Sequence, residues 1–245
     1  MEKWLNILKN YVDDFVLFGR IMPILTMVFP IVIYGIFKGF IKENAFDTVF
    51  YFGLVLVFLI FASKIVRERG KEFEKKMYKQ LGAKPTTIIL RYSDSTIDSL
   101  TKTRYHMHIN EKMKDIMLPL KMEDEDKESD NFYETAMNYL RKYANSNRES
   151  EPRVYQELKE YNYWRNLYGG KKISIFIYGF FIVREFLLIE KFNVKEMFIN
   201  PYPSYVGFII MLFSIIIICV VDNKKTVQRR AFDYAKVLTE TCERI

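Results

Sequence analysis

The chain has 245 residues, with 37 Lys and Arg against 30 Asp and Glu, and half of its residues are hydrophobic. The apolar residues concentrate in four blocks near the two ends, whereas the middle is strongly polar. This distribution excludes an ordinary soluble enzyme, a secreted disulfide scaffold and a disordered chain. The two cysteines, Cys219 and Cys242, suggest neither a disulfide framework nor a metal-ligand cluster.

Each of the four apolar blocks has a length that suits a membrane-spanning helix. The blocks cover residues 21–37, 48–63, 173–189 and 202–221. A helix that crosses a bilayer needs about 17–25 mostly apolar residues, because the hydrocarbon core is about 30 Å thick. The sequence therefore predicts an α-helical membrane protein with four transmembrane helices. The polar, amphipathic stretch before the first block is interpreted as an interfacial helix rather than a cleaved signal peptide.

Basic residues determine the predicted orientation. The short segments at residues 38–47 and 190–201 carry two Lys each and no Arg, whereas the opposite flanks of the blocks are strongly basic. These flanking residues are Lys64, Arg67, Arg69, Lys71, Lys171, Lys172, Lys224, Lys225, Arg229 and Arg230. The positive-inside rule then places both termini and the whole middle of the chain in the cytoplasm, with two small outer loops.

The resulting domain prediction is a two-plus-two arrangement around one cytosolic insert. It comprises an amphipathic segment (1–20), a first transmembrane hairpin (21–66), a cytosolic ligand-sensing domain (67–172), a second hairpin (173–222) and a cytosolic C-terminal helix (223–245). Residues 64–172 hold 23 basic and 18 acidic residues, a net +5 of the chain's +7.

Periodicity within the insert predicts a small α-rich domain with minor β structure. Helices are expected at residues 67–81, 133–143 and 151–168, and a short β-prone run at 86–90. The acidic run at 123–130 is interpreted as a solvated loop or linker.

A turn at residues 82–85 precedes a group of hydroxyl and basic side chains. The candidate ligand-binding residues here are Lys84, Thr86, Thr87, Arg91, Lys102, Arg104 and His106. Arginine forks and hydroxyls donate directed hydrogen bonds to phosphate oxygens, which favours an anionic ligand. The spacing is not that of a P-loop, so ATP hydrolysis gains no support. The alternative is a turn plus a solvated face paired to Asp94 and Asp98.

A second cluster, aromatic and basic, closes the insert at residues 161–172 and adds Arg165 and Asn166 to the candidate site. Aromatic rings stack on bases and cations neutralise phosphates, as in oligonucleotide-binding platforms. The alternative is an aromatic belt beside the membrane. The pair His106 and His108 lacks a further metal ligand, and no nucleophile or acid–base set is evident, so neither a metal, a cofactor nor an enzymatic activity is expected.

Arg184 and Glu185 lie inside the third apolar block and are the candidate intramembrane or pore residues. An ionisable residue in a membrane is by default a functional-site hypothesis. Adjacent residues on a helix point about 100° apart, so one interpretation is that Glu185 neutralises Arg184 of a neighbouring protomer. The alternative is a span that ends early, with Arg184 reaching outward to the interface.

Three groups of residues carry a resemblance to a known family. They are the run Gly82-Ala83-Lys84-Pro85-Thr86-Thr87-Ile88-Ile89-Leu90-Arg91, the element Arg104-Tyr105-His106, and Tyr161 with Arg165-Asn166-Leu167-Tyr168-Gly169. This pattern resembles small bacterial four-span membrane effectors of anti-phage defence systems, and is similar to the Hailong-type effector that is paired with a nucleotidyltransferase. The match spans most of residues 70–172 and departs from the family at Ala83, Asn162 and Trp164.

The resemblance implies an oligomeric, channel-like assembly in the bacterial inner membrane. Its cytosolic domain would bind a nucleotide or oligonucleotide second messenger made by a nucleotidyltransferase encoded nearby, and opening would disrupt the membrane and arrest growth. Four spans are too few for a roomy monomeric pore, so a symmetric homo-oligomer is expected, most simply a tetramer. The alternative function is a non-conducting membrane adaptor that recruits a cytosolic partner through the insert.

Overall fold

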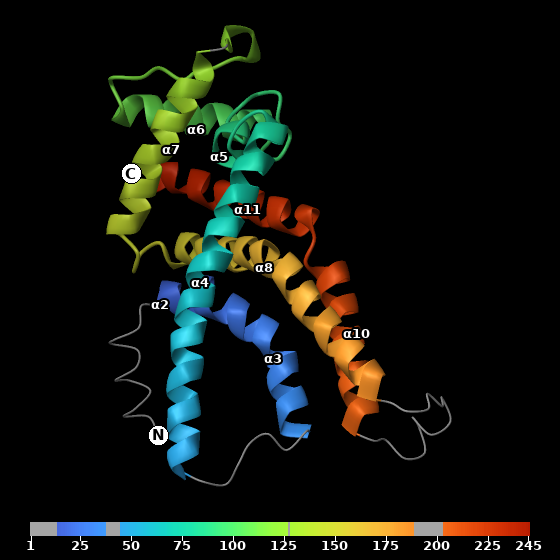
Figure 1. Ribbon diagram of the computed structural model, residues 1–245. Coiled ribbons are helices and arrows are strands. Elements are labelled where there is room, and N and C mark those ends of the chain that lie inside the picture. Colours follow the sequence, from blue (N-terminus) through green and yellow to red (C-terminus); the bar gives the residue numbers. More distant parts are fainter. Residues whose placement is uncertain (1–13, 38–44, 127, 189–202) are drawn as a thin grey trace. The chain divides into compact units, whose positions relative to one another are not determined.

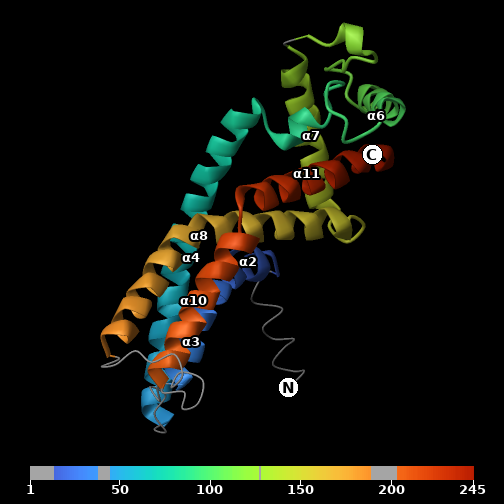
Figure 2. The ribbon, with the colours of Figure 1, turned by 90° about the vertical axis from the view of Figure 1, so that its right-hand side faces the viewer.

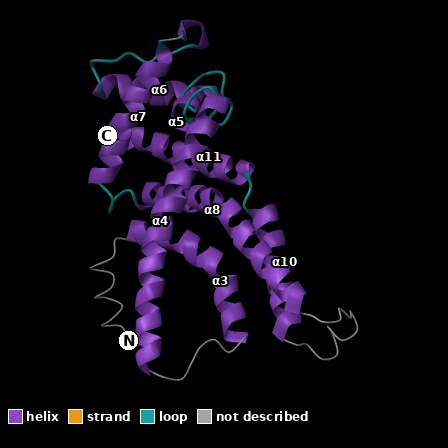
Figure 3. Ribbon diagram, in the orientation of Figure 1, coloured by secondary structure: helices purple, strands orange, loops and turns teal. Residues whose placement is uncertain are grey.

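The computed structural model describes residues 14–37, 45–126, 128–188 and 203–245 (Figure 1). Its described residues form helices and loops, with no strand among them (Figure 3), which confirms the prediction of an α-helical protein. They divide into two compact units. Unit 1 contains the residues up to Phe73 together with Asn162–Thr226, and unit 2 contains Glu74–Tyr161 together with Val227–Ile245.

Unit 1 is built from the helices that hold the four apolar blocks. Its elements are α2 (Asp14–Val16), the π-helical turn η1 (Leu17–Ile21), α3 (Met22–Phe37), the first part of α4 (Ala45–Leu81), the later part of α8 (Pro152–Leu188) and α10 (Pro203–Val221). By length and composition, the described stretch Asp14–Gly35 suffices to cross a membrane, and Tyr205–Val221 qualifies only together with the helix after it. The four-span arrangement thus stays a prediction. Residues 1–13 and most of the two expected outer segments lie outside the described residues.

Two apolar clusters hold unit 1 together. Where α3, α4 and α8 meet, the buried residues are Ile24, Met27, Val66 and Leu167. Where α3, α8 and α10 meet, they are Tyr34, Tyr178, Met211 and Ile218. The later part of α8 runs beside α10 in both views (Figures 1 and 2), as the second cluster requires.

Unit 2 is a bundle of shorter helices. Besides the end of α4 and the start of α8, it contains α5 (Pro85–Ile88), α6 (Ser99–Lys112), the 3₁₀ turn η2 (Met122–Asp124), α7 (Ser129–Ser146), most of α11 (Lys224–Glu240) and the 3₁₀ turn η3 (Thr241–Arg244). The helices expected at residues 67–81, 133–143 and 151–168 are confirmed within α4, α7 and α8. Of the residues whose helical spacing predicts an apolar face on α7, Tyr133, Ala136, Met137 and Leu140 are buried, whereas Tyr143 is half-buried.

The expected β-prone run at residues 86–90 is wrong, because Pro85–Ile88 forms the helix α5. Gly82 has a φ of +86°, the left-handed conformation that commonly ends a helix, and α4 stops just before it. Lys84 is extended and Pro85 takes the first helical position, where its fixed φ and missing N–H suit a helix start. The turn is therefore a helix-to-helix junction.

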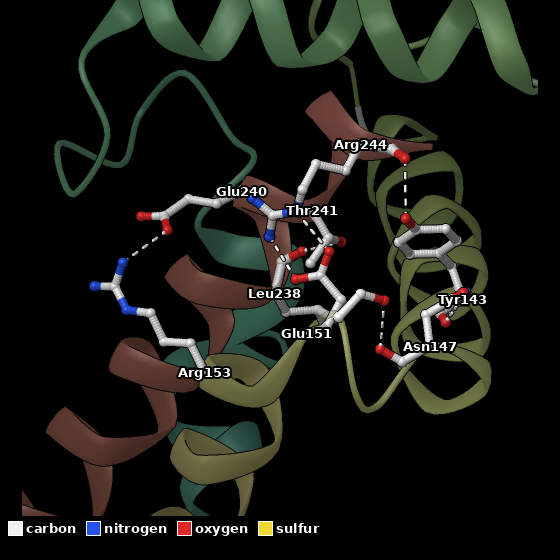
Figure 4. A network of polar contacts seen from close by, with 9 residues as sticks. Tyr143, Asn147, Glu151, Arg153, Leu238, Glu240, Thr241 and Arg244 are labelled. Atoms are coloured by element: carbon white, nitrogen blue, oxygen red, sulfur yellow. Dashed lines mark hydrogen bonds and ion pairs between the residues drawn. The ribbon is translucent and has the colours of Figure 1, made fainter.

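The C-terminal helix α11 is folded into unit 2. Its residues Val227, Ala231, Tyr234 and Leu238 are buried, so the apolar face of this helix is covered within the chain. Figure 4 shows how the chain end is fastened: the Arg244 guanidinium donates two hydrogen bonds to the buried Glu151 carboxylate, and Tyr143 Oη donates to Arg244 O at 2.9 Å.

Candidate functional site

Arg91, which follows α5, is a predicted ligand residue that lines a pocket. Its Nε donates to Asp130 Oδ1 at 2.8 Å and its Nη2 donates to Asp130 Oδ2, a two-pronged ion pair. These hydrogen bonds raise the pKa of Arg91. The pocket beside it has a volume of about 370 Å³ and is lined by Arg91, Glu125, Asp126 and Asp130. A carboxylate thus occupies the fork that a phosphate would need.

Lys102, on α6, holds the loop that carries Arg91. Its side chain is buried, and its Nζ donates to Arg91 O and, at 2.6 Å, to Asp94 O. Burial lowers the pKa of Lys102. With its ammonium directed at two main-chain carbonyls, Lys102 positions Arg91 and does not present its charge to the pocket.

His106 lies one turn further along α6 and is fully buried. Its Nδ1 lies 2.6 Å from Pro119 O, a carbonyl that can only accept, so Nδ1 carries the proton. The rings of Tyr92 and Tyr133 lie 5.3 and 5.4 Å from the imidazole, centroid to centroid. Burial lowers the pKa of His106, which favours a neutral histidine in the core of unit 2.

The remaining predicted cations of unit 2 are also paired. Lys84 contacts Glu134, and Arg104 Nη2 lies 2.7 Å from Glu243 Oε1. Thr86 and Thr87 are buried in α5, which packs against α7. The structure therefore brings Arg91 and Lys102 together, while Lys84 and Arg104 each take a carboxylate of their own.

The sequence missed the acidic half of this site. Glu125 Oε1 accepts a hydrogen bond from Tyr133 Oη at 2.8 Å, and Asp130 holds Arg91, although both lie in the run interpreted as a solvated loop. One local signal was present. Asp126, two residues before the N-cap Glu128 of α7, accepts a hydrogen bond at its Oδ1 from Ser129 N at 2.9 Å, and an Asp followed by a Ser in this spacing is a common signal of a turn that leads into a helix.

Arg165 and Asn166 belong to unit 1 and are buried there. Arg165 Nη2 donates to Asn162 Oδ1 at 2.6 Å, and Asn166 Nδ2 donates to Gly19 O at 2.6 Å. The first bond lies within α8, whereas the second ties α8 to the η1 turn. The two residues thus lie in a different unit from Arg91, and their polar groups serve helix packing.

A second polar cluster lies within unit 1, at the expected intramembrane pair. Arg184 Nη1 lies 2.7 Å from Glu185 Oε1, and Tyr34 Oη on α3 bonds to both side chains. Glu185 is fully buried, whereas the Arg184 side chain is 39% exposed. A Cβ on Gly207 of α10 would lie 2.5 Å from the Tyr34 ring, so a glycine is needed for α10 to approach the cluster. The charge of Arg184 is therefore neutralised within its own chain.

Comparisons of this chain with protein-family models, with curated proteins and with solved structures gave no match.

Proposed function

We propose that the chain is a membrane effector of bacterial anti-phage defence, an oligomeric channel-like protein gated by a nucleotide or oligonucleotide signal. The apolar surface of unit 1 is the observation that supports the membrane location. Phe29 on α3, Phe58 on α4, Phe180 on α8 and Phe213 on α10 are each 57–63% exposed. Large exposed apolar surfaces mark membrane or protein contacts, and an aromatic ring on every one of these four helices favours lipid.

The signal-binding part of the proposal centres on Arg91. Asp130 binds the Arg91 guanidinium in the same way as a phosphate would, because carboxylate and phosphate both accept two parallel N–H hydrogen bonds from arginine. Three carboxylates line the same pocket, so a phosphate enters only when it displaces Asp130. In this proposal Asp130 occupies the fork in the resting state and the signal takes its place.

The route from signal to pore follows two helices. Both α4 and α8 contribute residues to unit 1 and to unit 2, so a change at the Arg91 pocket has a continuous backbone to act through. A ligand can open the pore only if it binds the open state more tightly than the closed one. The proposed assembly is a symmetric homo-oligomer in the inner membrane, most simply a tetramer, with both termini in the cytoplasm.

The test is native mass spectrometry of the detergent-purified protein from cells that also express the nucleotidyltransferase, followed by ion flux in liposomes. We expect an oligomer with a phosphorylated adduct, lost in Arg91→Ala and retained more strongly in Asp130→Asn, which removes the competing charge. Arg153→Ala is the matched control, because Arg153 forms an exposed pair with Glu240. An adduct that survives Arg91→Ala refutes the assigned site. A bare monomer that co-purifies with a cytosolic partner and conducts nothing favours the adaptor function instead.

A further inference from the structure

An apolar cavity of about 440 Å³ lies within unit 1, between α3, α4 and α8. Its walls include Ile31 of α3, Phe58, Phe61, Ala62 and Ile65 of α4, and Ile177 of α8. The volume falls in the range of about 300–1,000 Å³ that is usual for small-molecule sites. Such a lining suits a hydrocarbon ligand.

The cavity opens to the outside along α4. Phe58, Phe61 and Ile65 line it and are nevertheless 57%, 61% and 53% exposed. Water forms no hydrogen bonds with an apolar rim, so removing this surface from water by filling the cleft with methylene groups is favourable. The rim thus favours a ligand that arrives from the lipid phase.

Two cations of α4 lie close to the walls of this cavity. Lys64 Nζ lies 5.7 Å from the centroid of the Phe61 ring, which is a wall of the cavity. Arg69 follows Ile65 by four residues, so it lies on the same face of α4, one turn beyond the wall. Neither cation forms an ion pair with a residue in the described part of the chain, and Glu68 beside Arg69 is bonded to Lys71 at 2.9 Å.

We propose that this cavity binds one acyl chain of an anionic phospholipid, whose phosphate is held by Lys64 and Arg69. An apolar slot beside two cations that form no ion pair with a described residue is complementary to a hydrocarbon tail below a negative headgroup. The inference rests on the membrane location in the proposed function, but it is independent of the Arg91 pocket and of gating.

The experiment first confirms that the full chain is recovered in the membrane fraction. The detergent-purified protein is then titrated with dioleoyl phosphatidylglycerol or dioleoyl phosphatidylcholine, and bound lipid is counted by native mass spectrometry. We expect one phosphatidylglycerol per protomer and weaker binding of phosphatidylcholine. The double variant Lys64→Gln/Arg69→Gln should bind phosphatidylglycerol about thirtyfold more weakly, because each basic residue at an anionic lipid surface contributes about fivefold.

Steric variants provide an independent arm. Ala62→Phe fills the cavity and should abolish lipid retention, whereas Val57→Phe adds the same ring at a position of α4 that is 53% exposed and is not a wall of the cavity. Arg67→Gln/Lys172→Gln is the charge-matched control, since neither cation forms an ion pair with a described residue. Both controls should retain the lipid.

Three results would overturn the inference. Equal binding of the two lipids would contradict the headgroup site, and retention of the lipid by Ala62→Phe would contradict the acyl-chain site. If no lipid is bound and the oligomer dissociates in Ala62→Phe, the cavity is instead a contact between two copies of the chain. If any of these occurs while signal-dependent flux persists, the proposed function stands and this inference alone fails. Recovery of the chain in the soluble fraction overturns both.

Discussion

Replacing Gly169 by alanine tests a backbone-to-backbone contact between α4 and α8 in unit 1. A Cβ at this position would lie 2.4 Å from Gly70 N and 2.6 Å from Val66 O, so α4 and α8 touch there backbone to backbone. Main-chain atoms cannot rotate out of the way as a side-chain tip can. The added methyl group must therefore separate the two helices, at an overpacking cost of about 1–3 kcal/mol, here toward the upper end.

The matched control lies in the same helix. A Cβ on Gly179 meets nothing within 4 Å, so Gly179→Ala should gain only helix propensity, about 1 kcal/mol. Gly169→Ala gains the same propensity, so the difference between the variants isolates the clash at about 3 kcal/mol. In a chain of this size about 3 kcal/mol lowers the unfolding temperature by roughly 6–12 °C. Gly70→Ala should fall between them, because its Cβ would meet the Asn166 side chain at 2.8 Å and Arg165 O at 2.9 Å.

The assay is thermal unfolding of the three variants and the parent in one detergent, followed by intrinsic fluorescence. Equal unfolding temperatures for Gly169→Ala and Gly179→Ala would refute the close contact between α4 and α8.

Two further predictions concern unit 2. Arg244→Met leaves the buried Glu151 carboxylate without its partner and should lower the free energy of unfolding by about 2–3 kcal/mol in chemical denaturation. This is below the usual cost of breaking a buried pair because Arg244 is half exposed. Arg153→Met should cost under about 0.5 kcal/mol, and equal losses in the two variants would contradict a stabilising role of the Arg244–Glu151 pair. Burial lowers the pKa of His106 below 6.5, the value of the unfolded state, so below that pH the folded state binds fewer protons than the unfolded state. The contribution of His106 to stability is therefore present above pH 6.5 and is lost as the pH falls below it. His106→Gln should weaken this loss of stability at acidic pH, measured as melting temperatures over a pH series.

The helices of this chain were predictable because their signals are local. The periodic apolar residues of α7 and the charged continuation of α4 can be found within a few turns of sequence. The prediction of β structure at residues 86–90 was wrong because a short apolar stretch is equally consistent with a buried strand and a buried helix. Pro85 at the first helical position decides between them, and that position becomes clear only once Gly82 is known to end α4.

The ion pairs of the candidate site had no such signal. Arg91 pairs with Asp130 and Lys84 with Glu134, partners 39 and 50 residues away on another helix. Composition marked these cations as available, whereas tertiary packing of α5 against α7 brings carboxylates to them. Basic residues could therefore be identified from sequence, but which of them face a pocket depended on contacts that no local pattern encodes.

The pair Arg184 and Glu185 shows how side-chain length overrides helical geometry. Their Cα–Cβ directions differ by about 100°, which led to the expectation of a partner in a neighbouring protomer. The arginine is long enough for Nη1 to reach Glu185 Oε1 at 2.7 Å, and Tyr34 from α3 bonds to both groups. Pairing of this charge thus requires no second copy, so the pair itself gives no support for a subunit contact at Arg184.

Glu185→Gln should accordingly destabilise each protomer and leave the assembly state unchanged. The variant strands the Arg184 charge beside Tyr34, at a cost of about 2–3 kcal/mol, reduced from the fully buried case because Arg184 is 39% exposed. Tyr34→Phe keeps the Arg184–Glu185 pair and should cost less, about 1–2 kcal/mol, for the two hydrogen bonds that its hydroxyl makes. Thermal unfolding and the subunit count by native mass spectrometry, measured on the same sample, separate the two effects. A Glu185→Gln oligomer that falls apart at unchanged protomer stability would show that the carboxylate bridges subunits after all.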